Sequence, residues 1–277
     1  MSCDLGRNSA ASSSDAWCSH PRCRVIESYE WCPKCEIFVS KLPASPYDSS
    51  YYYARRFRRS PASLARAELL WHLFADSLAG QSLLDFGCND GAFVSLAAGK
   101  VTRAVGVDIN TEILEFARQQ GGGEFLQPEN VTDRFDAVVA FDVIEHFDSP
   151  ADFFNSVERF VKKNGRLIIT TPNANSKWRK IYGEGWHGFG IPRYHRVLLS
   201  RRRLAELLQN ANYRLEKMFT TAPIEKPSWR LLIASGYRCD KRKMIKIARL
   251  PSSIAKFAVG KIMGGEEDTL CLVAQRT

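Results

Sequence analysis

The sequence has no apolar run that approaches the length of a membrane span, which needs about 20 mainly apolar residues. Its first fifteen residues, MSCDLGRNSAASSSD, are small and polar and contain no apolar core of a secretory leader. There is also no internal repeat. We therefore expect a cytoplasmic protein whose first residues, 1–15, form a disordered tail.

Acidic residues are scarce in one segment near the C-terminus. Residues 229–263 contain nine Lys and Arg residues and a single acid, Asp240, so this segment carries +8 of the chain's net charge of +9. Within it, Ile254, Phe257, Ala258 and Ile262 share one helical face. This combination suits peripheral contact with an anionic membrane surface. The alternatives are a lid that packs on the sheet and, as a less expected partner, nucleic acid.

Short apolar strands alternate with helical patterns over about a hundred residues. Parallel strands need helical crossovers that cover both faces of the sheet, so this alternation predicts an α/β fold with a doubly wound sheet. A helix precedes the alternation, with Leu64, Ala67, Glu68 and Trp71 at helical spacing. The expected strands are SLLDF, RAVGVDI, EFLQ, RFDAVVAFDV and GRLIITTP, followed by YRLEKMFT and TLCLVAQR. The expected helices are GAFVSLAAG, TEILEFARQQ, PADFFNSVERFVKK and SRRRLAELLQNAN.

A glycine-rich turn follows the first of these strands. Asp85 ends the strand, and Gly87 and Gly91 bracket a turn in which the backbone can approach a ligand. About 20 residues further on, Asp108 ends the next strand, where an acid can bind ribose hydroxyls. Read alone, the turn and the acid also fit a structural turn and a helix N-cap. A nicotinamide dinucleotide site is disfavoured because GCNDG replaces GxGxxG.

Several motifs together resemble a known family. LLDFGCNDGAF, VGVDIN, RFDAVVAFDVIEHF and KKNGRLIITTPN occur in the order and spacing of class I S-adenosylmethionine (SAM)-dependent methyltransferases. The segment YHRVLLSRRRLAELLQNANYRL resembles the branch that includes the ubiquinone-pathway O-methyltransferases. The resemblance covers about residues 63–277. It implies a Rossmann-like seven-stranded doubly wound sheet with the last strand antiparallel.

The resemblance also implies roles for particular residues. Asp85 and the backbone of the turn should meet the methionine part of SAM, and Asp108 should bind both ribose hydroxyls. Ile109 should pack on the adenine, and Phe141 and Asp142 should line the cofactor cleft. Asn89 stands where the family often has Gly, and Asn tolerates a left-handed backbone. The expected cofactor-binding set is Asp85, Gly87, Cys88, Asn89, Gly91, Asp108, Ile109, Phe141 and Asp142.

Three residues are candidates for catalysis. Glu145 and His146 follow the fourth strand in DVIEH, and His195 matches a His that recurs after strand five in the family. A His near neutrality can accept a proton from a hydroxyl nucleophile, so His195 is the leading candidate for the base. The alternative is that these residues only pack and orient their loops. In the related ubiquinone-pathway enzymes this segment is associated with a divalent metal, but Asp142 replaces the first Glu here.

Four cysteines cluster before the expected methyltransferase domain, at Cys18, Cys23, Cys32 and Cys35. Four thiolates can enclose Zn²⁺ tetrahedrally, so the cluster predicts a structural zinc knuckle. His20 could replace one ligand, and four reduced thiols packing a small hairpin are the alternative. Some SAM methyltransferases of glycan and natural-product clusters resemble this arrangement, a knuckle followed by a joint with the tyrosine pattern of Tyr47, Asp48, Tyr52 and Tyr53.

These expectations give one plan for the chain. A zinc knuckle at 16–40 and a Pro- and Tyr-rich linker at 41–62 precede the methyltransferase domain at 63–277, which includes the basic insertion 221–268. The expected reaction transfers a methyl group from SAM to an oxygen of a small-molecule, glycan or lipid-linked acceptor. The alternatives are RNA or protein as substrate, or a carbon or nitrogen acceptor atom.

Overall fold

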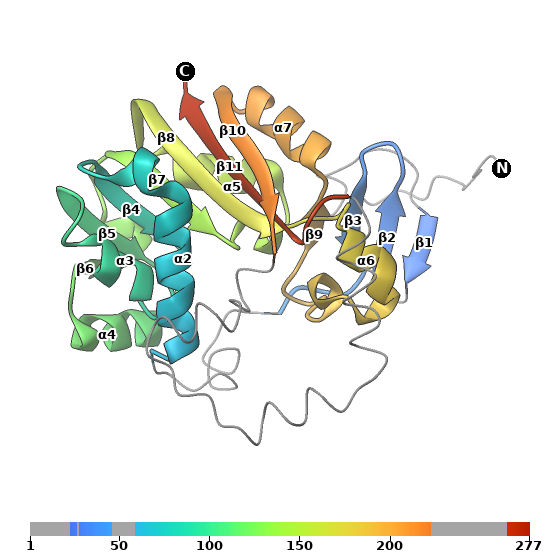
Figure 1. The fold of residues 1–277 in the computed structure, drawn as a ribbon, viewed down its shortest axis with the longest axis horizontal. Helices are drawn as coiled ribbons and strands as arrows, with labels where there is room; N and C mark the ends of the chain where they lie inside the picture. Colours follow the sequence, from blue (N-terminus) through green and yellow to red (C-terminus); the bar gives the residue numbers. More distant parts are fainter. Residues whose placement is uncertain (1–22, 27, 46–58, 223–264) are drawn as a thin grey trace.

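The computed structural model describes residues 23–26, 28–45, 59–222 and 265–277. Its main element is a seven-stranded sheet of order β10-β11-β8-β7-β4-β5-β6 (Figure 1). The strands are β4 (Ser82–Phe86), β5 (Arg103–Val107), β6 (Glu124–Leu126), β7 (Phe135–Phe141), β8 (Val161–Pro172), β10 (Tyr213–Thr221) and β11 (Thr269–Arg276). Strands β6, β5, β4, β7 and β8 run parallel, whereas β11 is antiparallel to both of its neighbours. The predicted doubly wound sheet with an antiparallel last strand is therefore confirmed.

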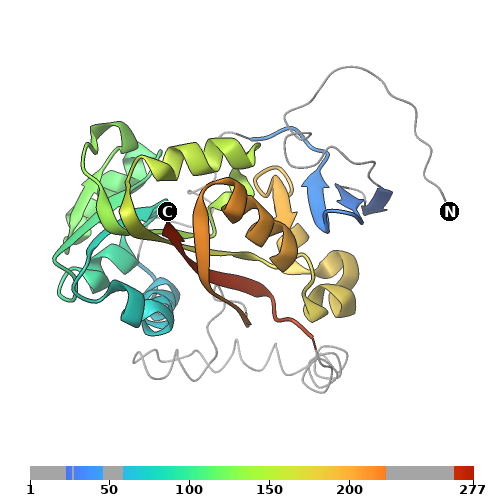
Figure 2. The same cartoon turned by 90° about the horizontal axis from the view of Figure 1, so that it is seen from above.

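Helices cover both faces of this sheet (Figure 2). On one face, α2 (Pro61–Leu78) and α3 (Ala92–Ala97) pack against Leu83, and α4 (Thr111–Gln120) continues this layer beside β6. On the other face, α5 (Pro150–Glu158) and α7 (Arg201–Asn210) belong to the same apolar core cluster as Leu84. Successive side chains of a strand point to opposite faces, so neighbouring Leu83 and Leu84 serve the two layers. Both faces are apolar, as a buried parallel sheet requires.

The order of the strands brings three strand ends together. Strand β4 lies between β7 and β5, and all three run parallel. From β4 the chain proceeds outward through β5 and β6, and it then returns to the other side of β4 to form β7 and β8. Ligands of such sheets bind beyond the carboxyl ends of the strands at this switch point.

Some boundaries and faces differ from the sequence predictions. Helix α2 starts at Pro61, because Ser60 caps it by accepting a hydrogen bond from Ser63 N and proline suits the first turn. Its buried face carries Ala67, Leu70, Phe74 and Leu78, while Leu64 is 43% exposed, so of the four residues noted at helical spacing only Ala67 is buried. The helix predicted over 150–163 ends at Glu158, and residues 161–163 start β8 instead.

The N-terminal residues form a second, four-stranded sheet that the sequence reading did not predict. Its order is β1-β2-β3-β9, with β1 (Cys23–Ile26), β2 (Tyr29–Cys32), β3 (Ile37–Ser40) and β9 (Val197–Leu199). Strand β9 belongs to the segment after β8, which also contains helix α6 (Lys177–Tyr182). One face of this sheet joins the main core through Ile37 and Val39, and the other joins an aromatic cluster through Tyr29 and Phe38.

Several predictions concern residues outside the described ranges. They include the tail at 1–15, most of the tyrosine-rich linker, and residues 229–263 of the basic segment. Within the described part of the chain, no helix has the length and apolarity needed to cross a membrane.

Candidate functional site

A cavity of about 790 Å³ opens at the carboxyl ends of β4, β5 and β7. Its volume falls in the range of sites for small molecules and cofactors. Most of the site residues predicted from sequence line it, namely Asp85, Gly87, Cys88, Asn89, Asp108, Ile109, Phe141, Asp142, His146 and His195. Two predicted residues are not part of the lining: Gly91 lies at the start of α3, and Glu145 is fully buried behind the wall.

The turn between β4 and α3 needs residues that accept a left-handed backbone. Gly87 has φ of +84°, and a Cβ there would lie 2.8 Å from Val143 Cγ2. Gly91 has φ of +70°, and a Cβ there would lie 2.5 Å from Phe125 Cε1. Asn89 adopts φ of +49°, the conformation that Asn tolerates better than most residues. The turn therefore exposes its backbone to the cavity at the end of β4.

Asp85 is a cavity carboxyl group with a shifted pKa. Its pKa is raised to about 7, chiefly by burial; Arg66 opposes this shift, and the nearby Asp108 and Asp90 add to it. A buried acid of this kind is readily ionised by a cationic ligand, because an opposite charge favours the carboxylate. By contrast, burial raises the pKa of the Cys88 thiol well above its usual value and keeps it neutral.

Asp108 links the turn to the next helix. Its Oδ2 accepts a hydrogen bond from Asn89 N at 3.1 Å, and its Oδ1 accepts one from Asn110 N at 3.0 Å. Asn110 in turn caps α4 by accepting from Ile113 N. Next to Asp108, Ile109 is 67% exposed at the cavity wall, which is unusual for a large aliphatic side chain and suits a flat apolar ligand group.

Arg66 is a cavity residue that the sequence reading missed. Its Nη2 lies 2.8 Å from Asp142 Oδ2, and Asp142 Oδ1 accepts a hydrogen bond from Thr170 Oγ1 at 2.9 Å. Asp142 has φ of +57°, which turns its carboxylate towards α2. A sequence signal for this role exists: Arg66 lies four residues before Leu70 and eight before Phe74, in the row of α2 that is buried. In an otherwise apolar row, such a residue needs a partner or a ligand.

The other end of the cavity carries two imidazoles. His146 Nδ1 lies 3.0 Å from the carbonyl oxygen of Tyr194, and His195 Nδ1 lies 3.0 Å from that of Gly188. A carbonyl oxygen only accepts, so in each neutral ring Nδ1 carries the proton and Nε2 is the proton-accepting nitrogen. The two rings lie edge to face with centroids 5.0 Å apart. Both histidines are thus in the tautomer that a general base requires.

Glu145 adds a carboxylate to this pair. Potential ligand atoms of Glu145, His146 and His195 lie within 4.8 Å of one another. Glu145 Oε2 accepts a hydrogen bond from Thr171 Oγ1 at 3.0 Å. Two imidazoles and a carboxylate are a ligand set that suits divalent cations such as iron and zinc. Asp142 is turned towards Arg66 and does not join this group, so the cluster differs from a site formed within DVIEH alone.

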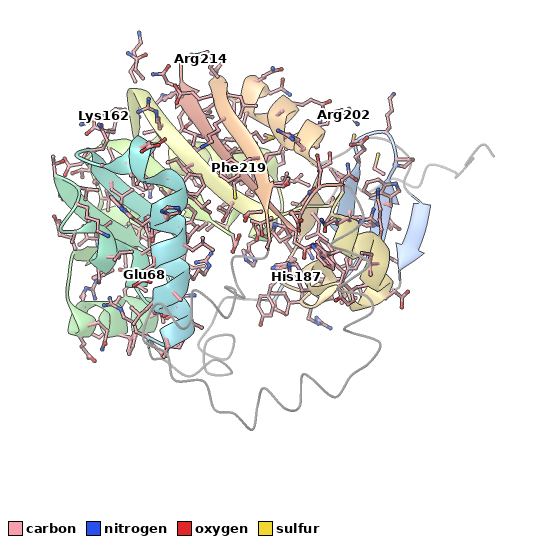
Figure 3. The ribbon with its side chains drawn as sticks, viewed as in Figure 1. Glu68, Lys162, His187, Arg202, Arg214 and Phe219 are labelled. Carbon is pink, nitrogen blue, oxygen red and sulfur yellow. The ribbon has the colours of Figure 1, made fainter. Side chains whose placement is uncertain are left out.

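His187, which precedes His195 by eight residues, lies away from the large cavity. It is in the segment after α6 (Figure 3). Its Nδ1 is 3.7 Å from Asp268 Oδ2. Asp268 also accepts a hydrogen bond from Trp186 Nε1 at 2.8 Å. Among the described residues, His187 does not line the large cavity. Its environment indicates that it helps to hold the aromatic segment against the start of β11.

The cysteine cluster is only partly described. Cys32 and Cys35 are buried at the turn between β2 and β3, and Cys35 N donates a hydrogen bond to Cys32 Sγ over 3.3 Å. Glu36 N also donates to Cys32 O at 2.8 Å, which closes the turn. Cys18 and the side chain of Cys23 lie outside the described residues. A zinc site with four cysteine ligands therefore stays a prediction.

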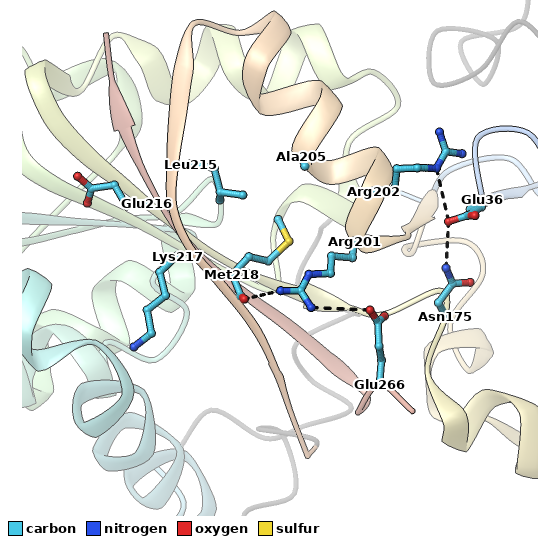
Figure 4. A pocket seen from close by; sticks show the side chains of 10 residues that line it. All are labelled: Glu36, Asn175, Arg201, Arg202, Ala205, Leu215, Glu216, Lys217, Met218 and Glu266. Carbon is cyan, nitrogen blue, oxygen red and sulfur yellow. Dashed lines mark hydrogen bonds and ion pairs between the residues drawn. The ribbon is translucent and has the colours of Figure 1, made fainter. Parts of the chain in front are cut away.

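A second cavity, of about 460 Å³, lies between α7, β10 and the turn after β2 (Figure 4). Its charged side chains contact one another. Arg201 Nη2 donates to the carbonyl oxygen of Met218 at 2.6 Å, and its Nη1 lies 4.0 Å from Glu266. Arg202 Nε lies 3.8 Å from Glu36 Oε2. The Arg202 contact ties the N-terminal hairpin to α7, and the Arg201 contacts tie α7 to β10 and to Glu266. We assign no ligand to this cavity.

Comparison with known proteins agrees with this fold and cavity. Residues 53–218, more than half of the chain, match the family model described as a methyltransferase domain. The geranyl diphosphate C-methyltransferase of Streptomyces coelicolor has a similar fold, with a TM-score of 0.52, 16% sequence identity and coverage of 76% of this chain and 77% of that one. The fold and the cavity define a Rossmann-like class I enzyme core. The chain belongs to the methyltransferase domain family.

Two curated relatives are similar over part of this region. A protein of Mycolicibacterium smegmatis named "Probable S-adenosylmethionine-dependent methyltransferase" is 26% identical over 157 residues, 54% of this chain and 59% of the relative. A ubiquinone biosynthesis O-methyltransferase of Aeromonas salmonicida is 30% identical over 111 residues, 36% of this chain and 47% of the relative. The chain thus spans about half the length of the relatives it matches. The resemblance to SAM-dependent methyltransferases is confirmed.

Proposed function

We propose that this chain binds SAM in the 790 Å³ cavity and catalyses methyl transfer to an oxygen atom of a small-molecule, glycan or lipid-linked acceptor. The observation that carries the proposal is that one cavity joins two chemically different ends. One end has the glycine turn, Asp85 and Asp108, and the other has His146 and His195. The O-methyltransferases among the relatives also favour oxygen as the acceptor atom.

The residues of the first end fit SAM. Asp108, which lines the cavity, would accept hydrogen bonds from the ribose hydroxyls, and exposed Ile109 would cover the adenine. Asp85 would face the cationic amino group of the methionine part, while Arg66 offers a cation to its carboxylate. When bound, SAM supplies an electrophilic methyl carbon, and its sulfur keeps the electron pair of the broken bond. The protein contributes mainly the alignment of donor and acceptor.

The residues of the second end would handle the acceptor. The Nε2 atom of His195 accepts the proton that the hydroxyl group loses as its oxygen bonds to the methyl carbon, and the Gly188 carbonyl stabilises the resulting imidazolium through Nδ1. His146 is held in the same tautomer beside it and is the second candidate for this role. The geometry favours His195 because its ring is nearly buried, which keeps it in one orientation.

A divalent cation is the second reading of the same end. Glu145, His146 and His195 would hold it, and it would polarise the acceptor oxygen. The chemistry of this donor set fits such an ion, so the structure allows both readings. Metal analysis and rates measured with and without EDTA separate them, because a base needs no ion.

The proposal is tested by a labelling experiment that assumes no particular methyl acceptor. The purified protein is incubated with methyl-labelled SAM and native cell extract, and the labelled product is isolated and its new methyl group located by mass spectrometry and NMR. We expect a labelled O-methyl group on a small molecule, glycan or lipid. Label on RNA, on protein, or on a carbon or nitrogen atom would show that the proposed acceptor is wrong. If labelling does not exceed that of a heat-inactivated control, the proposed activity is refuted.

Two associated proposals concern the ends of the chain. We propose that Cys18, Cys23, Cys32 and Cys35 hold a structural zinc ion; the hydrogen bond from Cys35 N to Cys32 Sγ supports a turn suited to a metal-bound thiolate. Protein purified without chelators should contain one zinc per chain, and the absence of zinc would refute this. We also propose peripheral membrane contact through residues 229–263, which liposome flotation with and without this segment tests.

A further inference from the structure

His195 lies on a loop without regular secondary structure. Within residues 191–196, Tyr194 N and His195 N both donate to the carbonyl oxygen of Ile191, at 2.9 Å each, which forms one tight turn. Strand β9 starts two residues after His195. The orientation of the imidazole therefore depends on what holds this loop from outside, unlike that of Asp85 at the end of a core strand.

The N-terminal hairpin, residues 29–42, holds the loop along one side. Strand β3 pairs with β9 in the register Ile37↔Leu199 to Val39↔Val197, and Ser40 N donates to the carbonyl oxygen of Arg196 at 2.9 Å. Ser40 Oγ donates to the carbonyl oxygen of Pro192 at 2.5 Å. The hairpin thus contacts the loop on both sides of His195 in the sequence.

Tyr29 makes the contact at His195 itself. Its hydroxyl group donates a hydrogen bond to the carbonyl oxygen of His195 over 3.1 Å, and the residue is completely buried. Its ring lies against Phe189, with centroids 5.2 Å apart, one residue after the Gly188 carbonyl that accepts from His195 Nδ1.

The opposite side of the loop is held by the segment after β7. Arg196 N donates to the carbonyl oxygen of Glu145 at 2.7 Å, and Arg196 Nε lies 2.6 Å from Asp148. The same side chain reaches back to the hairpin, because Arg196 Nη1 donates to the carbonyl oxygen of Leu42 at 2.5 Å. His195 is therefore fixed between the hairpin and the loop that carries Glu145 and His146.

We propose that Tyr29 is a positioning residue for His195 and that the N-terminal hairpin is a working part of the acceptor site. This inference rests on the proposed function, since it assumes that His195 acts on the acceptor. Tyr29 does not line the cavity, so it contacts neither the cofactor nor the acceptor. It acts through the backbone and the ring orientation of His195. A shift of about 1 Å in a catalytic group can lower a rate about 100-fold, so a lost anchor has a measurable effect.

The test compares two buried tyrosines. Tyr29→Phe removes the hydroxyl that donates to His195, whereas Tyr213→Phe removes a buried hydroxyl on β10 that has no hydrogen-bond partner among the described residues. The chain has five histidines, so ¹⁵N-histidine labelling and long-range ¹H–¹⁵N NMR resolve each imidazole and its tautomer. His195→Gln assigns the His195 signals. The spectra are recorded with bound S-adenosylhomocysteine, whose affinity is measured in parallel by calorimetry.

We expect Tyr29→Phe to shift the ¹⁵N signals of His195, and Tyr213→Phe to leave them unchanged. In the labelled-SAM assay on extract, Tyr29→Phe should lower the rate about tenfold, with an unchanged affinity for S-adenosylhomocysteine. Combined with His195→Gln, it should cause no further loss. Unchanged His195 signals, or equal effects of the two tyrosine variants, would overturn the inference.

A second variant guards against loss of folding. If Tyr29→Phe does not fold, Ser40→Ala removes the hydroxyl contact with Pro192 and is judged by the same NMR readings. The NMR and calorimetric measurements need no methyl acceptor. A chain that transfers no methyl group would therefore refute the proposed function while the His195 signals still decide the role of Tyr29.

Discussion

The two ends of the large cavity are held by different kinds of structure. At the cofactor end, Asp85 and Phe141 lie in strands β4 and β7 themselves, and Asp108 directly follows β5. At the acceptor end, His146 lies in a short 3-10 helix and His195 in a loop. The first end is fixed by the parallel sheet, and the second by contacts between segments that are more than 150 residues apart in the sequence.

The two kinds of support have different consequences for cofactor binding and for acceptor choice. A site built on strand ends tolerates changes elsewhere, because the sheet ladder sets its geometry. A site built on loops can change its substrate without disturbing the fold. We expect variants at the cofactor end to weaken the binding of SAM, and variants at the acceptor end to slow methyl transfer while leaving that binding unchanged.

The largest effect is expected for Asp108→Ala. The carboxylate would lose two charge-assisted hydrogen bonds to the ribose, which together are worth about 3–6 kcal/mol, and it would leave Asn89 N without its acceptor. We expect the affinity for S-adenosylhomocysteine to fall about 1,000-fold by calorimetry. Asp133→Ala is the control, because this exposed acid pairs with Arg103 outside the cavity. An affinity within about twofold of wild type would refute the assignment of Asp108.

His195→Gln should separate the two ends most clearly. Loss of a general base typically lowers the rate about 100-fold or more, and nothing at the cofactor end changes. We therefore expect a loss of about 100-fold in kcat with an unchanged KM for SAM. His187→Gln is the matched control, since this histidine lies beside Asp268. An unchanged kcat for His195→Gln would remove it as the base and leave His146 or a bound cation.

The pH dependence of SAM binding should follow Asp85. Burial raises the pKa of its carboxyl group to about 7 in the protein without ligand, so below this pH the group is protonated and must lose its proton to meet a cation. The affinity should therefore weaken as pH falls below about 7, by about tenfold per pH unit until the pKa of the bound state is reached. Asp85→Asn should abolish this slope, and a slope that persists in the variant would assign it to another group.

Ile109→Ala should have the smallest effect. The side chain is 67% exposed without ligand, so the free energy of unfolding should change by less than about 0.5 kcal/mol. Contact with adenine would be reduced, which costs about 1 kcal/mol, or about fivefold in affinity. Leu64→Ala, at a residue that is 43% exposed and outside the cavity, should change neither quantity. Equal affinities for both variants would show that Ile109 does not cover the adenine.

Much of the cofactor end could be predicted because its signals are local. The apolar run before Asp85, the left-handed positions at Gly87 and Asn89, and the acid after β5 are each read from a few neighbouring residues. Arg66 was missed because the residues noted at helical spacing, such as Leu64 and Glu68, are exposed and lie beside the buried row of α2. Only the packing of α2 against the sheet shows which row of that helix faces the cavity.

The acceptor end could be predicted only as a set of residue types. DVIEH and His195 were recognised as candidates, but nothing near them in the sequence indicated that their rings would lie 5.0 Å apart. The turn of Asp142 towards Arg66, which separates it from Glu145 and His146, depends on a contact across 76 residues. Likewise, the aromatic pattern around His187 gave no sign of its contact with Asp268.

The sequence by itself determined the doubly wound sheet and the glycine turn, because strand periodicity, helix caps and left-handed positions are properties of short segments. The tertiary structure alone decided that the cysteine-containing hairpin joins β9 and that Tyr29 reaches His195. Antiparallel pairing between distant segments, such as β3 and β9, depends on which strand edges come together in the folded protein. No pattern of neighbouring residues predicts which edges these are. Short sequence segments thus predict the cofactor end of the cavity, whereas the acceptor end depends on tertiary contacts.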